Sequence, residues 1–265
     1  MALDLQSLNP PQREAVLHGE GPLLVLAGAG SGKTRVLTYR VAHLVSERGV
    51  RPEQILAVTF TNKAAREMRE RLERLLHPGV RGASDEPPSH LRLTAGTFHS
   101  VCARWLRREA PRLGLPSGFA IYDDTDQLAL CRRALAEVDV SEHLLTAAAL
   151  RAYIERRRNA AEPLDRHETH EGPQRMEAIL RGAARYEELL HRAGALDFGS
   201  LITAMLRLLT EQPAVCDAYR ARYRYVLVDE YQDINRAQYQ LVRAISGGHE
   251  NLNVVGDDDQ SIYAF

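Results

Sequence analysis

The chain has 265 residues, of which 45% are hydrophobic and 26% charged, the composition of an ordinary water-soluble globular protein with one or two domains. Its 34 Lys and Arg residues nearly balance 35 Asp and Glu residues, for a net charge of -1. A nucleic-acid site therefore has to be a local patch. Cys102, Cys131 and Cys216 are far apart and odd in number, which argues against a disulfide framework and a zinc site.

The N-terminal residues contain no apolar signal core, and no apolar run reaches the roughly 18 residues that a membrane span needs. We therefore expect a cytoplasmic protein without a membrane partner. Arginine supplies nearly all of the positive charge, because the only lysines are Lys33 and Lys63. A lysine kept in so arginine-rich a chain suggests a site that needs a compact charge on a flexible stem, although chance explains Lys63 equally well.

The first third of the chain alternates strand and helix patterns. Residues 23–26 are an apolar run that predicts a buried strand, and a glycine-rich stretch over 28–32 follows it. An amphipathic pattern over about 33–47 predicts a helix. Residues 55–60 predict a second strand, and residues 62–76 a second helix. This alternation predicts an α/β fold whose parallel sheet is covered by helices on both faces.

The middle of the chain does not continue the alternation of strand and helix patterns. Residues 77–90 collect Pro, Gly, Ser and Asp and predict a surface loop, followed by a strand at 91–95 and a helix at 98–108. Residues 109–195 show almost no strand signal, which predicts a mostly helical insert. Its expected helices cover residues 126–138, 147–159 and 173–192, with an exposed loop over 162–172.

The final third returns to the first pattern, with strands predicted at residues 225–228 and 252–255 and a helix at 235–245 between them. We therefore expect residues 1–108 and 196–265 to form one α/β domain in two segments, and residues 109–195 to interrupt it as a separate subdomain.

A glycine-rich loop follows the first strand and opens a helix, which is the context of a phosphate-binding loop. Such a loop wraps backbone N–H groups around phosphates at a helix N-terminus. Lys33 would contact the phosphates, and the Thr34 hydroxyl would hold magnesium. The first glycine of the G-x-x-x-x-G-K-[ST] pattern is replaced by Ala27. The whole loop consists of Ala27, Gly28, Ala29, Gly30, Ser31, Gly32, Lys33 and Thr34.

A second strand ends in two carboxylates, in the sequence VLVDE over residues 226–230. Asp229 at the strand tip suits magnesium, directly or through water. Glu230 would then face the attacking water as a general base. A capped turn is the plain alternative, and the nearby phosphate-binding loop weakens it. Together the two motifs predict only a P-loop NTPase, and the resemblance to a known family described next implies that its fold is RecA-like.

The sequence DEYQD over residues 229–233 resembles the D-E-x-Q-D box of superfamily 1 helicases of the UvrD/Rep/PcrA family. Other segments resemble motifs of that family and occur in its order. The resemblance covers residues 8–265. The further segments are LNPPQ at residues 8–12, TFTNKAA at 59–65, GTFHS at 96–100 and GDDDQSIYAF at 256–265.

For the nucleotide, the resemblance implies that Gln12 contacts the adenine edge and that Arg35 lies against its ring. It also implies that Gln260 senses the γ-phosphate and couples it to DNA. Lys33, Glu230 and Gln260 are then the candidate catalytic residues, with ATP and Mg²⁺ as the ligands.

For DNA, the resemblance implies a single-strand path lined by side chains that stack on bases whatever their sequence. Phe60 could instead be a core residue at a strand end, and His99 could make only a loop hydrogen bond. Phe265 stands where the family usually has Trp, a larger stacking platform. The implied path consists of Phe60, Asn62, Thr97, His99, Tyr263 and Phe265.

Several charged clusters have two interpretations. The arginines at positions 104, 107, 108 and 156–158 either bind phosphates or form solvated helix faces, and both readings stay open. Residues 257–259 are three consecutive Asp, which cannot all face one ion, so a turn is the better interpretation. Asp197 and Phe198 match the family's return from the insert and are interpreted as structural.

The resemblance predicts the ATP-binding half of an ATP-dependent 3′–5′ DNA helicase that acts on single-stranded DNA in repair or replication. Its partners would be single-stranded DNA, a second motor domain that supplies arginine fingers, and DNA-repair proteins. The chain alone should bind ATP–Mg but not unwind DNA. Two alternatives stay open: the motor of a recombination helicase-nuclease, and a non-catalytic module that binds nucleotide, DNA or a partner.

Overall fold

A computed structural model of the protein describes residues 3–76, 93–166 and 171–257. The loop predicted over residues 77–90, part of the loop predicted over 162–172, and the candidate residues Gln260, Tyr263 and Phe265 lie outside these ranges.

The chain forms two compact units. The sheet unit comprises Met1–Val101, Gln212–Ile234 and Val242–Phe265, and the helical unit comprises Cys102–Glu211 and Asn235–Leu241. The domain borders expected from the sequence, at 108/109 and 195/196, stay a prediction.

The sheet unit is built on five strands in the order β1-β7-β6-β2-β3, and every neighbouring pair is parallel. This confirms the predicted α/β fold with a parallel sheet. Because all strands run the same way, their carboxyl ends meet at one edge of the sheet. The strands are β1 (Leu23–Leu26), β7 (Leu252–Gly256), β6 (Tyr225–Val228), β2 (Ile55–Thr59) and β3 (Thr94–Thr97).

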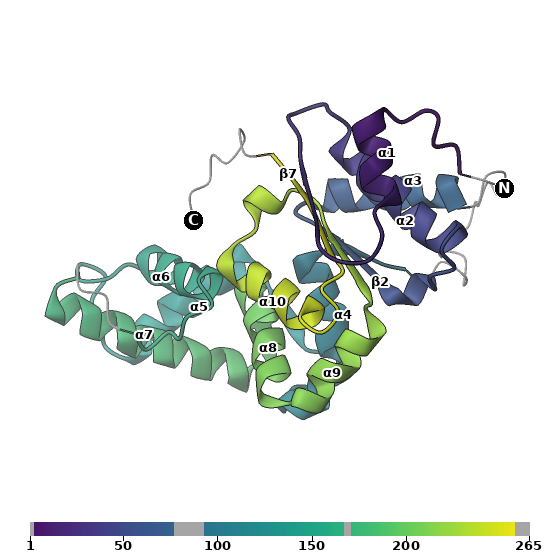
Figure 1. Ribbon diagram of the computed structural model, residues 1–265. Coiled ribbons are helices and arrows are strands. Elements are labelled where there is room, and N and C mark those ends of the chain that lie inside the picture. The colour runs from purple at the N-terminus through teal and green to yellow at the C-terminus, as the bar shows by residue number, and fades with distance from the viewer. Residues whose placement is uncertain (1–2, 77–92, 167–170, 258–265) are drawn as a thin grey trace. The chain divides into compact units, whose positions relative to one another are not determined.

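Helices α2 (Lys33–Ser46) and α3 (Asn62–Leu76) lie along one face of this sheet (Figure 1). Apolar side chains that recur at helical spacing, such as Val41 of α2 and Met68 of α3, pack on alternate strand residues such as Leu227. Burying this face holds the helix N-termini at the carboxyl edge of the strands.

Other helices of the sheet unit are shorter. They include α1 (Pro10–Leu17), the turn η1 (Pro52–Gln54) and α9 (Pro213–Arg222). The beginning of α4 (Phe98–Glu109) and the end of α10 (Arg236–Ser246) also belong to it. Neither α1 nor α9 had been predicted from the sequence.

The helical unit packs α5 (Asp124–Glu137), α6 (Ala147–Asn159) and α7 (Pro173–Arg192) around a core of their own. The three predicted helices of the insert are thereby confirmed. The packing is close at Gly182, where an added Cβ would lie 2.9 Å from Leu135 Cδ2. Four elements of the unit lie outside the sequence-based prediction: α8 (Phe198–Glu211), the turn η2 (Ala110–Leu113), and the parallel strands β4 (Ala120–Tyr122) and β5 (Ala195–Asp197).

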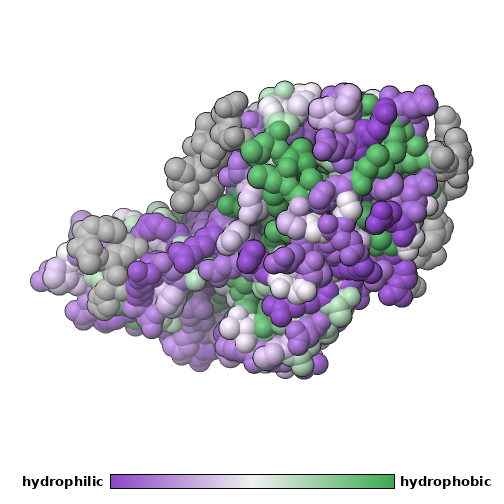
Figure 2. All heavy atoms as spheres, in the orientation of Figure 1, coloured by the Kyte–Doolittle hydropathy of each residue, from purple (hydrophilic) through white to green (hydrophobic). Residues whose placement is uncertain are grey.

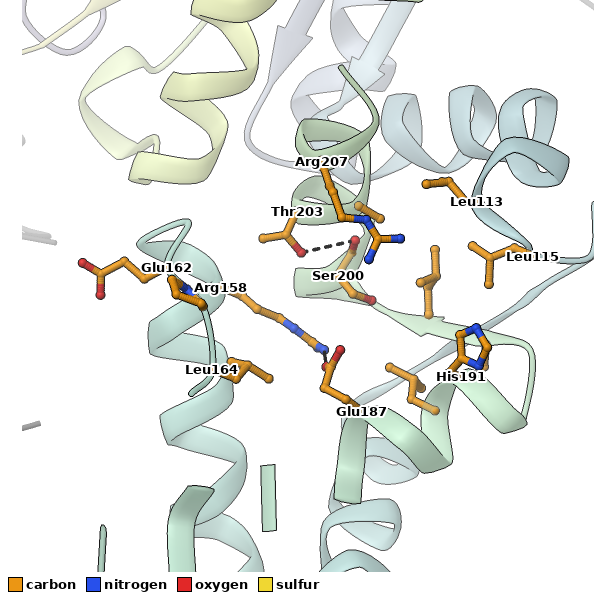
Figure 3. A pocket seen from close by; sticks show the side chains of 15 residues that line it. Leu113, Leu115, Arg158, Glu162, Leu164, Glu187, His191, Ser200, Thr203 and Arg207 are labelled. Atoms are coloured by element: carbon orange, nitrogen blue, oxygen red, sulfur yellow. Dashed lines mark hydrogen bonds and ion pairs between the residues drawn. The ribbon is translucent and has the colours of Figure 1, made fainter. Parts of the chain in front are cut away.

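Two of the six arginines considered for phosphate binding are buried inside the helical unit. Arg157 and Arg158 are 6% and 5% exposed. Arg157 pairs with Glu162, and Arg158 pairs with Asp197 and Glu187, the latter pair being visible beside a cavity of about 400 Å³ in Figure 3. Phosphate binding is therefore the wrong reading for these two side chains, because internal carboxylates already neutralise them.

The surface of the sheet unit is not uniformly polar, and hydrophobic side chains reach it in Figure 2. On the edge strand β1, Leu24 and Leu26 are 58% and 56% exposed, whereas Val25 packs toward the core beneath α2 and α3. Within the described parts of the chain, no helix combines the length and the apolar character needed to cross a bilayer.

Candidate active site

The glycine-rich loop connects β1 to α2, as its sequence predicts. It is tied to the neighbouring strand, because the Ala27 backbone N–H donates to the Gly256 carbonyl oxygen at 3.1 Å. Gly30 and Gly32 have φ angles of 72° and 89°. Residues other than glycine adopt this left-handed backbone region only at a cost in energy. Gly32 is the N-cap of α2, so the loop ends where the helix exposes its unpaired N–H groups.

Gln12 reaches this loop from α1. Its own helix begins with a capping box, in which Gln12 and Asn9 bond to each other's backbone N–H groups. The free end of the Gln12 amide donates from Nε2 to the Ser31 carbonyl oxygen at 2.8 Å. Gly32 lies so close that an added Cβ would be 3.0 Å from Gln12 Nε2. The predicted adenine contact thus lies beside the predicted phosphate loop.

Lys33 is folded back onto the loop and is only 8% exposed. Its Nζ donates to the Ala27 carbonyl oxygen at 2.9 Å and forms an ion pair with Asp257 Oδ2 at 3.0 Å. Asp257 follows β7 directly and is 2% exposed. The interpretation of Asp257 as part of a turn missed this buried ion pair.

Thr34 and Asp229 lie together on the buried side of the site, where Thr34 Oγ1 donates to Asp229 Oδ2 at 3.1 Å. Burial raises the pKa of the Asp229 carboxyl group, Glu230 raises it further, and the Thr34 hydrogen bond opposes both effects. A hydroxyl and a carboxylate form the oxygen donor set that Mg²⁺ takes from a protein, together with water and phosphate. The pair therefore fits this ion.

Among the described residues no group of three or more His, Cys, Asp or Glu side chains could hold a metal ion.

Glu230 occupies an unusual backbone position, with φ 51° and ψ 52°. Left-handed backbone at a residue other than glycine is sparsely populated and concentrates at functional sites. The turn η3 (Tyr231–Asp233) follows at once, and Gln232 Nε2 donates to Glu230 Oε2 at 2.7 Å. The side chain of the predicted general base is therefore held in place by its own turn.

A cavity of about 330 Å³ opens over these groups. Arg35 borders it and lies over the Tyr39 ring at 5.3 Å. Arg71 reaches the cavity from α3. The cavity is lined by Ala29, Gly30, Gly32, Lys33, Thr34, Arg35, Arg71 and Glu230.

The candidate DNA contacts that are described lie at or just after the carboxyl ends of β2 and β3. Phe60 is 49% exposed, so the alternative that it is a core residue is wrong. Asn62 is exposed in the first turn of α3. Thr97 is buried and its Oγ1 accepts the Ser100 backbone N–H at 3.2 Å, which caps α4. His99 is half-buried, and burial lowers its pKa.

The sequence profile of the UvrD/REP helicase N-terminal domain matches residues 8–265. The chain belongs to this family. Relatives include proteins called ATP-dependent DNA helicase PcrA: 42% identical over 98% of this chain in Bacillus subtilis (strain 168), and 41% identical over 98% in Staphylococcus aureus (strain Mu50 / ATCC 700699). The alignments cover 34% of each relative, so this chain spans about a third of their length.

Three residues at the site of this UvrD/REP helicase domain had no role in the sequence-based prediction. Gln232 lies inside the DEYQD box, whose pattern could have pointed to it. Asp257 lies in the GDDDQSIYAF segment but was assigned only to a turn. Arg71 has no local motif, and only the packing of α3 brings it to the cavity.

Proposed function

We propose that this chain is the ATP-binding half of an ATP-dependent DNA helicase motor that moves 3′ to 5′ on single-stranded DNA in repair or replication. The observation that carries the proposal is the convergence of Lys33, Thr34, Asp229 and Glu230 at the carboxyl edge of one parallel sheet. The name of the relatives, ATP-dependent DNA helicase PcrA, supports the same activity.

In this proposal the phosphates enter the cavity, and Lys33 exchanges Asp257 for them. Thr34 and Asp229 would hold Mg²⁺, which would supply charge neutralisation at the phosphates. Glu230 accepts the proton of the water that attacks the γ-phosphorus, while ADP leaves from the other side. Gln260 senses the γ-phosphate and couples it to DNA.

The other nucleotide contacts follow from position. Gln12 reads the adenine edge, Arg35 lies against the ring after leaving Tyr39, and the backbone N–H groups of residues 27–34 wrap the phosphates. Arg71 is a further cation at the cavity, where a fork of N–H donors suits phosphate oxygens.

Single-stranded DNA would run along the ends of β2 and β3, where exposed Phe60 offers a stacking face. The proposed path is Phe60, Asn62, Thr97, His99, Tyr263 and Phe265. A second motor domain, with arginine fingers, would close over the nucleotide. DNA-repair proteins would be further partners, and the protein would act in the cytoplasm. The domain borders proposed for this half are those expected from the sequence.

The test is phosphate release from ATP–Mg with and without single-stranded DNA. It compares this chain, the complete gene product, and the Lys33→Ala and Glu230→Gln variants of each. The proposal expects DNA-stimulated turnover by the complete product, loss of turnover in Lys33→Ala, only slow residual turnover in Glu230→Gln, and nucleotide binding with little turnover by this chain alone. If the complete gene product does not hydrolyse ATP, the motor function is wrong, and a non-catalytic module that binds nucleotide, DNA or a partner takes its place. Nuclease activity on the same DNA would point instead to a recombination helicase-nuclease.

A further inference from the structure

One glutamine connects the two sides of the candidate active site. Gln232 Nε2 donates to Glu230 Oε2 at 2.7 Å and to Asp233 Oδ2 at 3.3 Å, while its Oε1 accepts the Asp257 backbone N–H at 3.1 Å. Both partners of the nitrogen are carboxylate oxygens, and the partner of the oxygen is an N–H group. The chemistry of the partners therefore fixes the amide orientation.

The side chain of Gln232 lies close to the backbone of β7 at Gly256. An added Cβ at Gly256 would lie 3.1 Å from Gln232 Oε1 and 3.6 Å from Tyr231 Cβ. The φ angle of Gly256 is not in the left-handed region, so a side chain at this position would act through its close approach to Gln232 and not through backbone strain.

The contacts of Gln232 form part of a continuous chain. Lys33 Nζ pairs with the Asp257 carboxylate, the Asp257 backbone N–H bonds to Gln232, and Gln232 bonds to Glu230. The lysine proposed to hold the phosphates and the carboxylate proposed to activate water are thus linked through a single amide side chain. Such a link holds the base relative to the phosphate site.

A glutamate side chain has several rotamers, and only some point its oxygen at a water in line with the phosphate. A hydrogen bond to one carboxylate oxygen selects an orientation and leaves the other oxygen to accept a proton. We propose that Gln232 is a positioning residue that orients the Glu230 carboxylate and is itself anchored by the Asp257 backbone. This inference rests on the proposed ATP hydrolysis.

Three variants of the complete gene product separate orientation from general damage. Gln232→Met removes all three side-chain hydrogen bonds, whereas Gln232→Glu keeps an acceptor for the Asp257 N–H but adds a carboxylate beside those of Glu230 and Asp233. Gly256→Ala crowds the Gln232 amide oxygen without changing its chemistry. Gln240→Met is the matched control, because the side chain of Gln240 has no hydrogen-bond partner among the described residues.

The measurements are kcat and KM for DNA-stimulated ATP hydrolysis across pH, with the affinity for ADP and the thermal midpoint as checks on folding. We expect all three variants to lose roughly 10- to 100-fold in kcat, the effect of losing a hydrogen bond to a charged group, with less than about twofold change in KM. Gln232→Glu alone should move the acid limb of the kcat profile to higher pH, because two adjacent carboxylates share a proton. In the Glu230→Gln background, Gln232→Met should cause no further loss.

Wild-type kcat in Gln232→Met, or a further loss of kcat in the Glu230→Gln background, would overturn the positioning role. So would equal losses in kcat and ADP affinity, which would mean damage to the whole site. If wild-type protein shows no ATP hydrolysis that Lys33→Ala abolishes, the proposed function itself fails. The two failures are therefore distinguishable.

Discussion

The ammonium group of Lys33 lies 3.0 Å from the Asp257 carboxylate, and both side chains are almost fully buried. Removing one partner of a buried ion pair leaves an uncompensated charge and typically costs about 3–5 kcal/mol. Phosphates that enter the site would supply the missing negative charge. The pair therefore competes with the ligand that Lys33 is proposed to bind.

We expect Asp257→Asn to lower the thermal midpoint of the nucleotide-free protein and to increase the rise in midpoint that ATP–Mg produces. The destabilisation should be about 3 kcal/mol, because the asparagine amide can still accept a hydrogen bond but carries no charge. Asp165→Asn, on the exposed surface, is the control and should change neither value. A nucleotide-induced rise equal to that of wild type would contradict the competition.

Glycine is required at one position of the phosphate loop and is replaceable at another. Gly32→Ala forces a side chain into φ 89° and places its Cβ 3.0 Å from Gln12 Nε2, which should lower the free energy of unfolding by about 1–2 kcal/mol. Gly28→Ala meets no atom within 4 Å and should be nearly neutral. Chemical denaturation without nucleotide measures both, and equal losses would show that this geometry is not responsible.

Arg71→Ala should weaken ATP–Mg binding about 3- to 30-fold, because Arg71 lines the cavity with Lys33 and Glu230. Arg69 lies on the same helix and is exposed, so Arg69→Ala is matched for charge and helix propensity. Equilibrium titration with a fluorescent nucleotide measures both affinities. Equal affinities for the two variants would remove Arg71 from the site.

The pH dependence of stability should carry a signature of Asp229. Burial raises the pKa of this group in the folded protein above its value in the unfolded chain. Its contribution is therefore most favourable at low pH and is lost as pH rises through the folded-state pKa.

Wild type should gain stability relative to Asp229→Asn as the pH falls from 7 toward the unfolded-state pKa of about 4, with a slope of at most about 1.4 kcal/mol per pH unit. Denaturation of both proteins without nucleotide or Mg²⁺ gives this difference. If wild type instead loses stability relative to Asp229→Asn as the pH falls, burial does not dominate the pKa of this carboxyl group.

Phe60→Ala should weaken binding of single-stranded DNA by the complete gene product roughly 5- to 150-fold, the loss expected for one stacked base. Because Phe60 is half-exposed, the thermal midpoint should hardly change. Leu17→Ala removes a similarly exposed apolar side chain from α1 and should leave DNA binding intact. Fluorescence anisotropy with a labelled oligonucleotide separates the two outcomes.

The parts of the site that the sequence predicts are those in which neighbours in the chain are neighbours in space. The phosphate loop is one such part, because a strand, two left-handed glycines and a helix N-terminus follow one another. DEYQD is another, since the strand tip sets both carboxylates. The parallel sheet followed from apolar runs alternating with helical periodicity.

The parts that escaped prediction depend on contacts between distant segments. The pairing of Lys33 with Asp257, and the arrival of Arg71 at the cavity, require the strand order, which no local pattern contains. Helices α8 and α9 lie outside the sequence-based prediction, although α8 carries apolar residues at helical spacing after the motif residues Asp197 and Phe198. The sequence pattern of Arg157 and Arg158 indicates a solvated or phosphate-binding run, but in the folded unit Glu162 and Asp197 pack against them.

Strand β1 carries the phosphate loop and has a described neighbour, β7, along only one of its sides. In a parallel ladder only alternate residues bond to a given neighbour, so part of the β1 backbone is free to exchange its amide hydrogens with solvent. The loop is thus attached to an end strand of the described sheet, where local opening costs less than at a central strand. Occupation of the loop should therefore slow amide exchange at Leu24 and Leu26, on the strand that leads into the residues proposed to wrap the phosphates.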